Sequence, residues 1–236
     1  MKISPTAIKC YRRCPRRWGF QKICGLEEPA STSTDDGTAC HQIAEGYLKT
    51  GKLSGNPSYV AIMQEEIPYL PAPGTCVVEH HVEYELDDVT WHGYVDATHP
   101  ASRSRIDHKY VRTFDYNLTP TALAADAQGV IYALAPAPDG EIWDTTVLRW
   151  NYVSKTKRAC QPTVAVLRRE DALATLRSVW LPLAREMIAW HNLFSGVNRW
   201  VAVAWVDALI PCEPGDCWSF GRHCPFGAIC SHRGYR

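Results

Sequence analysis

The stretch IDHKY, residues 106–110, is the part of this sequence from which the fold and the chemistry can both be approached. An acid, Asp107, and a lysine, Lys109, flank a histidine between apolar and aromatic neighbours. In a half-buried strand, side chains at positions i and i+2 lie on the same face. Asp107 and Lys109 are therefore predicted to point at the same neighbour. That neighbour is either water around an exposed ion pair, or a metal ion and a phosphate.

The composition of the 236-residue chain predicts a globular, soluble, intracellular protein. Apolar residues make up 46%, and nine residues are tryptophan, which is not the composition of a disordered chain. No apolar run approaches the roughly 20 residues of a membrane span, and the N-terminus has no signal-peptide segment. We therefore expect a cytoplasmic location, in a prokaryotic or phage-like setting, and no membrane partner. The formal net charge of zero excludes a global attraction to nucleic acid.

Apolar periodicity predicts the order helix, three strands, helix, strand for the centre of the chain, which is a mixed-sheet α/β arrangement. The three consecutive strands are expected from the period-2 pattern and the turn residues between them. We expect helices over 4–22 (interrupted at Pro15), 38–50, 59–66, 120–135 and 169–194, strands over 77–86, 89–98, 105–113 and 144–154, and a loop over 31–37.

The strand before IDHKY ends in GYVDAT and carries Asp96 close to its end. If the two strands form a hairpin, Asp96 and Asp107 converge and repel each other unless a cation lies between them. Mg²⁺ and Mn²⁺ favour such carboxylates, together with water and a substrate phosphate. Lys109 could then steady a water or the charge on phosphorus, which predicts metal-assisted phosphodiester hydrolysis. The alternative is an exposed ion pair, worth about 0–1 kcal/mol.

Two further features could belong to such a site. His41 lies in GTACHQIAEG on a predicted helix, where a lone histidine is more often structural than a ligand. Gln128 and Tyr132, in AQGVIY, are four residues apart and therefore share one helix face. Their alternative interpretation is an ordinary amphipathic helix.

Taken in order, GTACH, GYVD, IDHK and QGVIY resemble the PD-(D/E)XK nuclease superfamily in its RecB-type exonuclease branch. The resemblance implies a restriction-endonuclease-like αβββαβ core and a Mg²⁺- or Mn²⁺-dependent exonuclease acting on single-stranded DNA or DNA ends. By the resemblance, His41, Asp96 and Asp107 would hold the metal and Lys109 would be the catalytic lysine. Gln128 and Tyr132 would support the site and the DNA. Tyr110 departs from the threonine that often follows the lysine in this branch.

Ten cysteines in a chain without a secretion signal favour metal ligation over disulfides. Cys217, Cys224 and Cys230 are separated by six and five residues, with Cys212 nearby. This spacing alone leaves zinc and an iron–sulfur cluster both open. The resemblance implies a [4Fe–4S] cluster that joins the two ends of the chain, and its ligands would be Cys14, Cys217, Cys224 and Cys230. Cys10 or Cys24 could replace Cys14, Cys212 could replace Cys217, and Cys40, Cys76 and Cys160 are expected to be small buried residues.

Residues 9–22 carry six basic side chains and no acid. They form either a solvated helix face or a phosphate-contacting patch. We predict DNA contacts by Arg12, Arg13, Arg16 and Arg17. Since the sequence has no P-loop, any unwinding of DNA would need a partner such as a helicase or recombination protein.

The predicted organisation is one nuclease domain over 1–236. It would contain a catalytic core over 37–160, a flanking helix over 161–199, and cluster-binding ends over 1–36 and 200–236. Two other functions stay open: a catalytically weak DNA-binding or recombination accessory module with the same fold, and a zinc-stapled structural protein. Cleavage assays separate the first from a nuclease, and the brown colour of an iron–sulfur protein separates the second.

Overall fold

A computed structural model describes residues 1–28, 32–213, 217–219 and 222–231. Its centre is a mixed sheet in the order β1-β3-β4-β5-β6, with β2 on the other edge of β3. The β1–β3 and β4–β5 pairs are parallel, and the other pairs in this sheet are antiparallel. Its strands are β1 (Lys2–Ile3), β2 (Val77–Leu86), β3 (Val89–His99), β4 (Ser104–Val111), β5 (Thr145–Ser154) and β6 (Ala159–Arg168).

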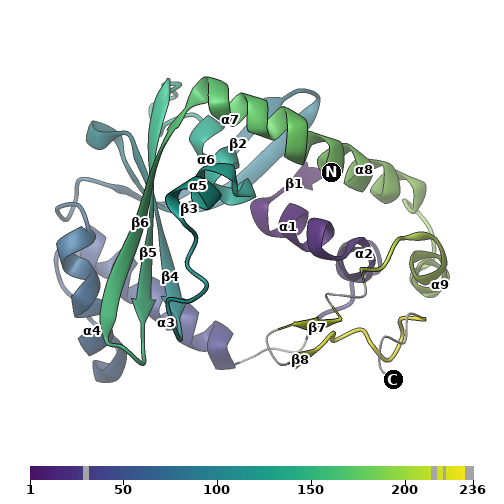
Figure 1. The fold of residues 1–236 in the computed structure, drawn as a ribbon, viewed down its shortest axis with the longest axis horizontal. Coiled ribbons are helices and arrows are strands. Elements are labelled where there is room, and N and C mark those ends of the chain that lie inside the picture. The colour runs from purple at the N-terminus through teal and green to yellow at the C-terminus, as the bar shows by residue number, and fades with distance from the viewer. Residues whose placement is uncertain (29–31, 214–216, 220–221, 232–236) are drawn as a thin grey trace.

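Helices cover both faces of this sheet (Figure 1). One face is covered by α3 (Thr32–Thr50), α4 (Pro57–Met63) and the 3₁₀ helix η1 (Gln64–Tyr69). On the other face lie α1 (Pro5–Arg13), α5 (Pro120–Ala125), α6 (Ala127–Leu134), α7 (Arg169–Thr175), the π-helical turn η3 (Leu176–Trp180) and α8 (Leu181–Leu193). The remaining elements are α2 (Pro15–Lys22), η2 (Pro100–Ser102), α9 (Arg199–Leu209) and a small hairpin of β7 (Trp218–Ser219) and β8 (Arg222–His223).

The largest apolar core lies between the sheet and the layer that contains α6. Trp91 of β3 and Trp150 of β5 are almost fully buried there against Val130 and Ile131 of α6. A smaller core lies on the opposite face, where Leu48 of α3 packs with the sheet. Apolar residues on both faces of the central strands explain why a helical layer is needed on each side.

The predicted mixed α/β fold and its central strands are confirmed, with shifts of one or two residues at the strand ends. The expected break at Pro15 is also present, because Cys14 is extended between α1 and α2. The loop expected over 31–37 is wrong for residues 32–37, which form the first turns of α3. Polar residues such as Asp35 suit a helix start, where a carboxylate faces the positive end of the helix dipole.

The helix expected over 120–135 is divided into α5 and α6 at Asp126. This residue is extended, and its side chain caps α6 by accepting from Gln128 N. The break also brings α5 close to Gly129, where a Cβ would lie 2.4 Å from the Leu123 carbonyl oxygen. The helix expected over 169–194 contains the π turn η3 just before Pro182, a residue that cannot supply the next helical N–H. The flanking helix expected over 161–199 is wrong for residues 161–168, which belong to β6. β1 and α9 were not predicted.

The N-terminal helix α2 lies beside the C-terminal segment in the half of the molecule away from β4 to β6 (Figure 1). Phe20 of α2 packs with Val206 of α9, with Ile210 directly after α9, and with Phe226 near the C-terminus. Gly19 allows this contact, since a Cβ there would lie 2.8 Å from the Val206 side chain. The packing of side chains thus joins the N- and C-terminal regions.

Candidate active site

The candidate site lies where β3 and β4 separate. The two strands pair only from Ala97 to His99 with Ser104 to Ile106. Beyond this pairing, His108 N donates to Asp96 Oδ2 at 2.7 Å. The Asp96 carboxylate therefore accepts the hydrogen bond that a backbone carbonyl of the neighbouring strand would accept in a regular pair. This bond holds the carboxylate where β3 and β4 separate.

The strands β2 and β3 are distorted at the same level. Val95 lies in the core beside α6, whereas Ala97, two residues on, packs with Leu48 of α3 on the opposite face. A regular strand would place both on one face. Glu79, which lies in β2 between the paired residues Val78 and His80, has a φ of 50°. Such left-handed conformations of residues other than glycine are uncommon, and they cluster at functional sites.

Asp107, Lys109 and Gln128 form one connected group on the α6 side of β4. Lys109 Nζ lies 2.6 Å from Asp107 Oδ2 and donates to Gln128 Oε1 at 3.2 Å. The other end of the Gln128 amide donates to Asp107 Oδ1 at 2.5 Å. The side chain of Asp107 is only 3% exposed, whereas that of Lys109 is 34% exposed. The Lys109 ammonium is therefore accessible from solvent, whereas the buried Asp107 carboxylate is held in place by Gln128.

Tyr132 supports this group from the next turn of α6. Gln128 Nε2 donates weakly to Tyr132 Oη at 3.4 Å, and Tyr132 Oη donates to the carbonyl oxygen of Tyr94 at 2.5 Å. Gly93 is required here, because a Cβ would lie 2.9 Å from the Tyr132 ring. The predicted pairing of Gln128 and Tyr132 on one helix face thus links α6 to both β3 and β4.

His41 approaches from α3, on the other face of the sheet. Its Nδ1 lies 3.4 Å from Asp96 Oδ2, and its ring stands edge-on to that of His108 at 5.8 Å between centroids. Burial, together with the positive charge of His108, lowers the pKa of His41. A neutral imidazole is the form that binds metals.

The carboxylates of Asp96 and Asp107 lie close together, and the neighbouring positive charges do not fully offset their repulsion. Burial and then the charge of Asp107 raise the pKa of Asp96 to about 7. Burial opposes the charge of Lys109, but its ion pair with Asp107 outweighs this and raises the lysine pKa. Lys109 is therefore a cation at neutral pH, and Asp96 holds a proton more strongly than an ordinary aspartate.

This donor set fits a hard divalent cation in its chemistry, since a cation would offset the repulsion that raises the pKa of Asp96. Among the residues that the structure describes, no three His, Cys, Asp or Glu side chains are arranged as a ready-made metal site. Mg²⁺ sites commonly use one or two carboxylates and complete their coordination with water and substrate phosphate. The structure brings His41 to Asp96, and it places Asp96 one strand away from Asp107.

A buried polar group behind the site was not predicted. Glu66 of η1 is fully buried and accepts from Asn151 Nδ2 at 2.8 Å, and its Oε1 lies 2.5 Å from His108 Nδ1. Burial opposes a charge on His108, but the charge and the hydrogen bond of Glu66 outweigh it and raise the His108 pKa to about 9. His108 lies inside IDHK, so the motif contained one signal for this group. An isolated glutamate such as Glu66 carries none.

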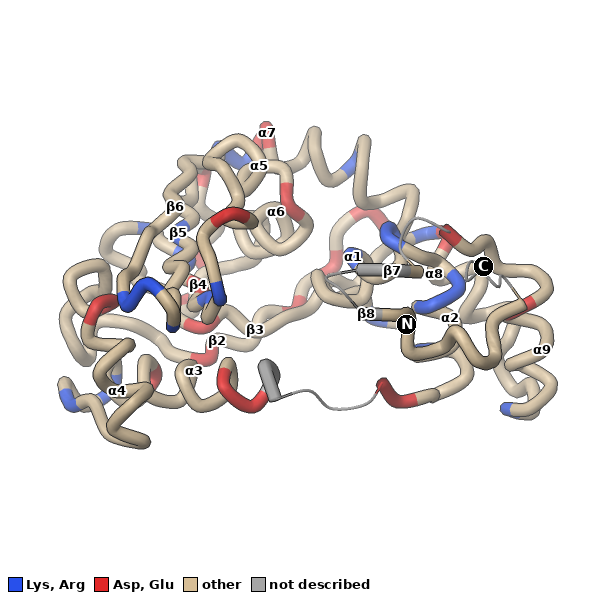
Figure 2. Tube along the Cα trace, turned by 60° about the horizontal axis from the view of Figure 1, so that its bottom comes forward, with Lys and Arg blue, Asp and Glu red and all other residues tan. Residues whose placement is uncertain are grey.

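The four arginines predicted to contact DNA have different surroundings. Arg12 and Arg13 are exposed, and the Arg12 guanidinium lies 4.9 Å from the centre of the Trp180 ring. Arg16 is bound to Asp207 at 3.1 Å and to the Ile210 carbonyl, and Arg17 pairs with Glu28 at 2.6 Å. Figure 2 shows the basic positions of α2 in the half of the molecule that holds α9.

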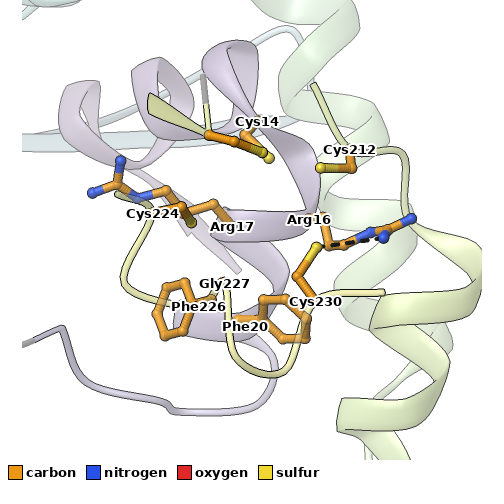
Figure 3. Close-up of a pocket in the computed structure, with 10 residues that line it drawn as sticks. Cys14, Arg16, Arg17, Phe20, Cys212, Cys224, Phe226, Gly227 and Cys230 are labelled. Atoms are coloured by element: carbon orange, nitrogen blue, oxygen red, sulfur yellow. Dashed lines mark hydrogen bonds between the residues drawn. The ribbon is translucent and has the colours of Figure 1, made fainter. Parts of the chain in front are cut away.

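Cysteines from both ends of the chain line one pocket between α2 and the C-terminal segment (Figure 3). Cys10 and Cys24 are not among the lining residues: Cys10 contacts Gln21, and Cys24 is buried in a neighbouring apolar cluster. Phe20 and Phe226 form part of the wall. The pocket is lined by all four predicted ligands and by the alternative: Cys14, Cys212, Cys217, Cys224 and Cys230.

Thiolates suit both iron–sulfur clusters and zinc, so the chemistry of the lining fits either group. Burial, followed by the neighbouring thiols, raises the pKa of Cys212. In the described part of the chain, however, the sulfur atoms are not arranged as a ready-made metal centre. Of the other cysteines, Cys40 is buried as predicted, and Cys76 and Cys160 are half-buried.

Comparison with known proteins finds a likeness to nucleases over part of the chain. The sequence model of the PD-(D/E)XK nuclease superfamily matches residues 2–74. This segment contains His41 and ends before β2, so it does not reach Asp96 or Asp107. No curated protein matches the chain. Within the described residues, no helix combines the length and the apolar character needed to cross a membrane.

Three solved structures are similar to the chain to different degrees. The protein SSO0001 has a TM-score of 0.52 at 16% identity, over 98% of this chain and 86% of that one. A candidate exonuclease from Eubacterium rectale has a TM-score of 0.50 at 13% identity, over 80% of this chain and 82% of that one. A phage-related exonuclease from Haemophilus somnus 129PT has a TM-score of 0.35 at 12% identity, over 84% and 97%. The first two likenesses concern the fold, a mixed sheet flanked by helices as in the restriction-endonuclease-like core.

Proposed function

We propose that the protein is a divalent-metal-dependent deoxyribonuclease of the RecB-like branch, acting as an exonuclease on single-stranded DNA or DNA ends. One observation carries the proposal: Asp107, Lys109 and Gln128 contact one another at the opening of the sheet that also holds Asp96. The superfamily match over residues 2–74 supports a nuclease. The ordered motifs of the sequence support the branch.

In this proposal, His41, Asp96 and Asp107 would hold Mg²⁺ or Mn²⁺, which when bound would supply positive charge to the phosphate and its attacking water. Lys109 is a cation at neutral pH and has no free electron pair to accept a proton. It would therefore orient the water and offset charge on the phosphate oxygens. Gln128 would hold Asp107 and Lys109 in place through the two ends of its amide. The water oxygen would bond to phosphorus as the water loses a proton to solvent, one P–O ester bond would break, and the leaving oxygen would take up a proton.

The basic segment of α1 and α2 is the proposed DNA-contacting surface. Asp207 and Glu28 already neutralise Arg16 and Arg17, so these two arginines would mainly fix α2 in the fold. Arg12 and Arg13 are exposed and would make most of the phosphate contacts. A helicase or recombination partner would supply any unwinding.

We further propose a structural [4Fe–4S] cluster in the cysteine pocket, with zinc as the alternative. Cys14, Cys217, Cys224 and Cys230 would be the ligands, and Cys212 could take the place of Cys217. A cluster there would add covalent bonds to ends that already meet by packing. Iron, sulfide and zinc contents of anaerobically purified protein distinguish the two groups. A Cys14→Ser variant that keeps the full metal content would contradict this ligand set.

Cleavage of end-labelled single-stranded DNA in Mn²⁺ tests the nuclease proposal. Wild type should shorten linear DNA, lose activity in EDTA and leave circular DNA uncut. Asp107→Asn keeps an oxygen for Gln128 and should be inactive, whereas Asp115→Asn, on an exposed loop position after β4, should match wild type. Undiminished cleavage by Asp107→Asn would overturn the proposed site. Cleavage of circular DNA would support a nuclease but contradict exonuclease action. Binding of DNA without cleavage would favour the accessory module.

A further inference from the structure

Tyr94 is an aromatic side chain exposed in the middle of β3. Its exposed fraction is 58%, whereas its neighbour Val95 is fully buried and Gly93 faces the Tyr132 ring. Because side chains alternate along a strand, Tyr94 points away from α6, toward the face that α3 partly covers. His41 of α3 lies on that face. A large ring in this position contributes little to the core of the protein.

His81 of β2 supports the Tyr94 ring from the side. The two residues are direct cross-strand partners, and their ring centroids are 4.8 Å apart with planes inclined by 42°. Contacts of this kind hold an aromatic ring in a defined orientation. The pair therefore presents a fixed aromatic surface to solvent, which we call the Tyr94–His81 platform.

The platform lies beside the part of the candidate active site that His41 and Asp96 form, on the face of the sheet opposite to the side chain of Lys109. Tyr94 precedes Asp96 by two residues, which is about 7 Å along a strand. The Tyr94 carbonyl accepts from Tyr132 Oη at 2.5 Å, and Tyr132 is itself contacted by Gln128, which binds Asp107. The backbone under the platform is thus tied to the same helix that holds the acid–lysine group. Such a connection keeps a subsite at a constant distance from the reacting phosphate.

We infer that the Tyr94–His81 platform stacks on a nucleobase of the DNA strand whose phosphate lies at Asp96 and Asp107. The inference rests on the proposed function and adds a base-binding subsite to it. Every base has a flat face that can stack on an aromatic ring, so the subsite would favour unpaired bases without reading their sequence. It would therefore direct the activity toward single-stranded DNA or frayed ends.

The charges around the platform favour a base over other occupants. Glu79 lies in β2 between Val78 and His80, the partners of Ala97 and Val95. Away from a bound cation, this acid would repel a phosphate but not a neutral base. Lys2 binds Glu83 at 2.7 Å, which offsets the carboxylate nearest to His81. The aromatic surface is limited to two rings among polar side chains, and protein docking sites are usually larger apolar patches.

Binding of single-stranded oligonucleotides in EDTA, where no cleavage is expected, tests the inference. Tyr94→Val keeps a strand-forming residue and should weaken binding about 5- to 100-fold, the range expected for one lost base–aromatic stack. Tyr94→Phe should bind like wild type. Tyr116→Val is the matched control, since Tyr116 is a tyrosine that is 76% exposed on a different segment. Thermal unfolding of each variant checks that the fold is retained.

Oligonucleotides with one abasic position locate the stacked base. Moving the abasic position along the strand should weaken wild-type binding at one register and should have no such effect on Tyr94→Val. If the wild type cleaves DNA but Tyr94→Val binds as tightly as wild type at every register, the platform is rejected and the nuclease proposal stands. If the wild type neither binds nor cleaves DNA, the proposed function fails and the platform fails with it.

Discussion

The substitution Asp96→Asn separates two effects of Asp96 on folding stability: the unfavourable burial of its charge and the hydrogen bond that it accepts. Asparagine removes the charge but keeps an oxygen that can accept from His108 N, as Asp96 does at 2.7 Å. Burial and the charge of Asp107 raise the pKa of Asp96 from 3.8 to about 7. The folded protein therefore binds this proton more tightly than the unfolded chain does. Ionised Asp96 destabilises the folded state, and the substitution should relieve that cost.

The size and the pH range of the effect follow from this shift. The penalty is absent well below the unfolded pKa, grows as the pH rises from about 4 to about 7, and is constant above that. A shift of about three units corresponds to about 4 kcal/mol. This is an upper bound, because Asp107 shares the repulsion and 12% of the Asp96 side chain is exposed. We expect Asp96→Asn to gain about 2–4 kcal/mol at pH 8 and less than half of that at pH 5.

Urea denaturation in EDTA at both pH values measures this gain. Asp87→Asn is the control of opposite sign: the hydrogen bond from Arg177 lowers the pKa of Asp87, so ionised Asp87 is stabilising above its unfolded pKa. This control should lose stability at pH 8. An Asp96→Asn variant that is less stable than wild type at pH 8, or equally stabilised at both pH values, would refute the reasoning.

Three further predictions concern the surroundings of the site. Gln128→Leu removes both hydrogen bonds of the amide and should lower the cleavage rate about 10- to 100-fold, as loss of a supporting residue commonly does. DNA binding in EDTA should be unchanged, and an equal loss of binding would contradict a positioning role. Glu66→Ala leaves the buried charge of His108 without its partner and should lower the free energy of unfolding, measured with urea, by about 3–5 kcal/mol, which is more than Glu66→Gln should. Equal losses in the two variants would show that the charge of Glu66 is unimportant. At limiting Mn²⁺, cleavage should fall as the pH drops below about 7, because a proton then competes with the cation for Asp96, and a profile without a step between pH 6 and 8 would argue against this competition.

The sequence predicted the parts of the fold that depend on local pattern. Period-2 alternation located β2, β3 and β4, and the spacing of Gln128 and Tyr132 placed both on one face of α6. The spacing of Asp107 and Lys109 likewise predicted a shared face, and they are in contact. These features follow from residues at most four positions apart.

Features that depend on long-range packing were not predictable in this way. The sheet opens at Asp96 because β4 leaves β3 after Ile106, a property of the whole sheet rather than of either strand sequence. The change of faces along β2 and β3 occurs beside Glu79, whose backbone is left-handed. Glutamate is not a residue type from which a left-handed conformation would be predicted. Glu66 reaches His108 across 42 residues of sequence. Such contacts become visible only when the chain is folded.

If Lys109 acts on the phosphate, its loss should abolish cleavage and leave binding of DNA unchanged. Wild type, Lys109→Ala and the control Lys52→Ala, an exposed lysine after α3, are compared on end-labelled single-stranded DNA in Mn²⁺ and in EDTA. We expect wild type and Lys52→Ala to degrade the DNA, whereas Lys109→Ala should bind it but leave it intact. If Lys109→Ala cuts as fast as wild type, or if none of the three cuts, Asp107 and Lys109 are only an ion pair on a DNA-binding or structural fold.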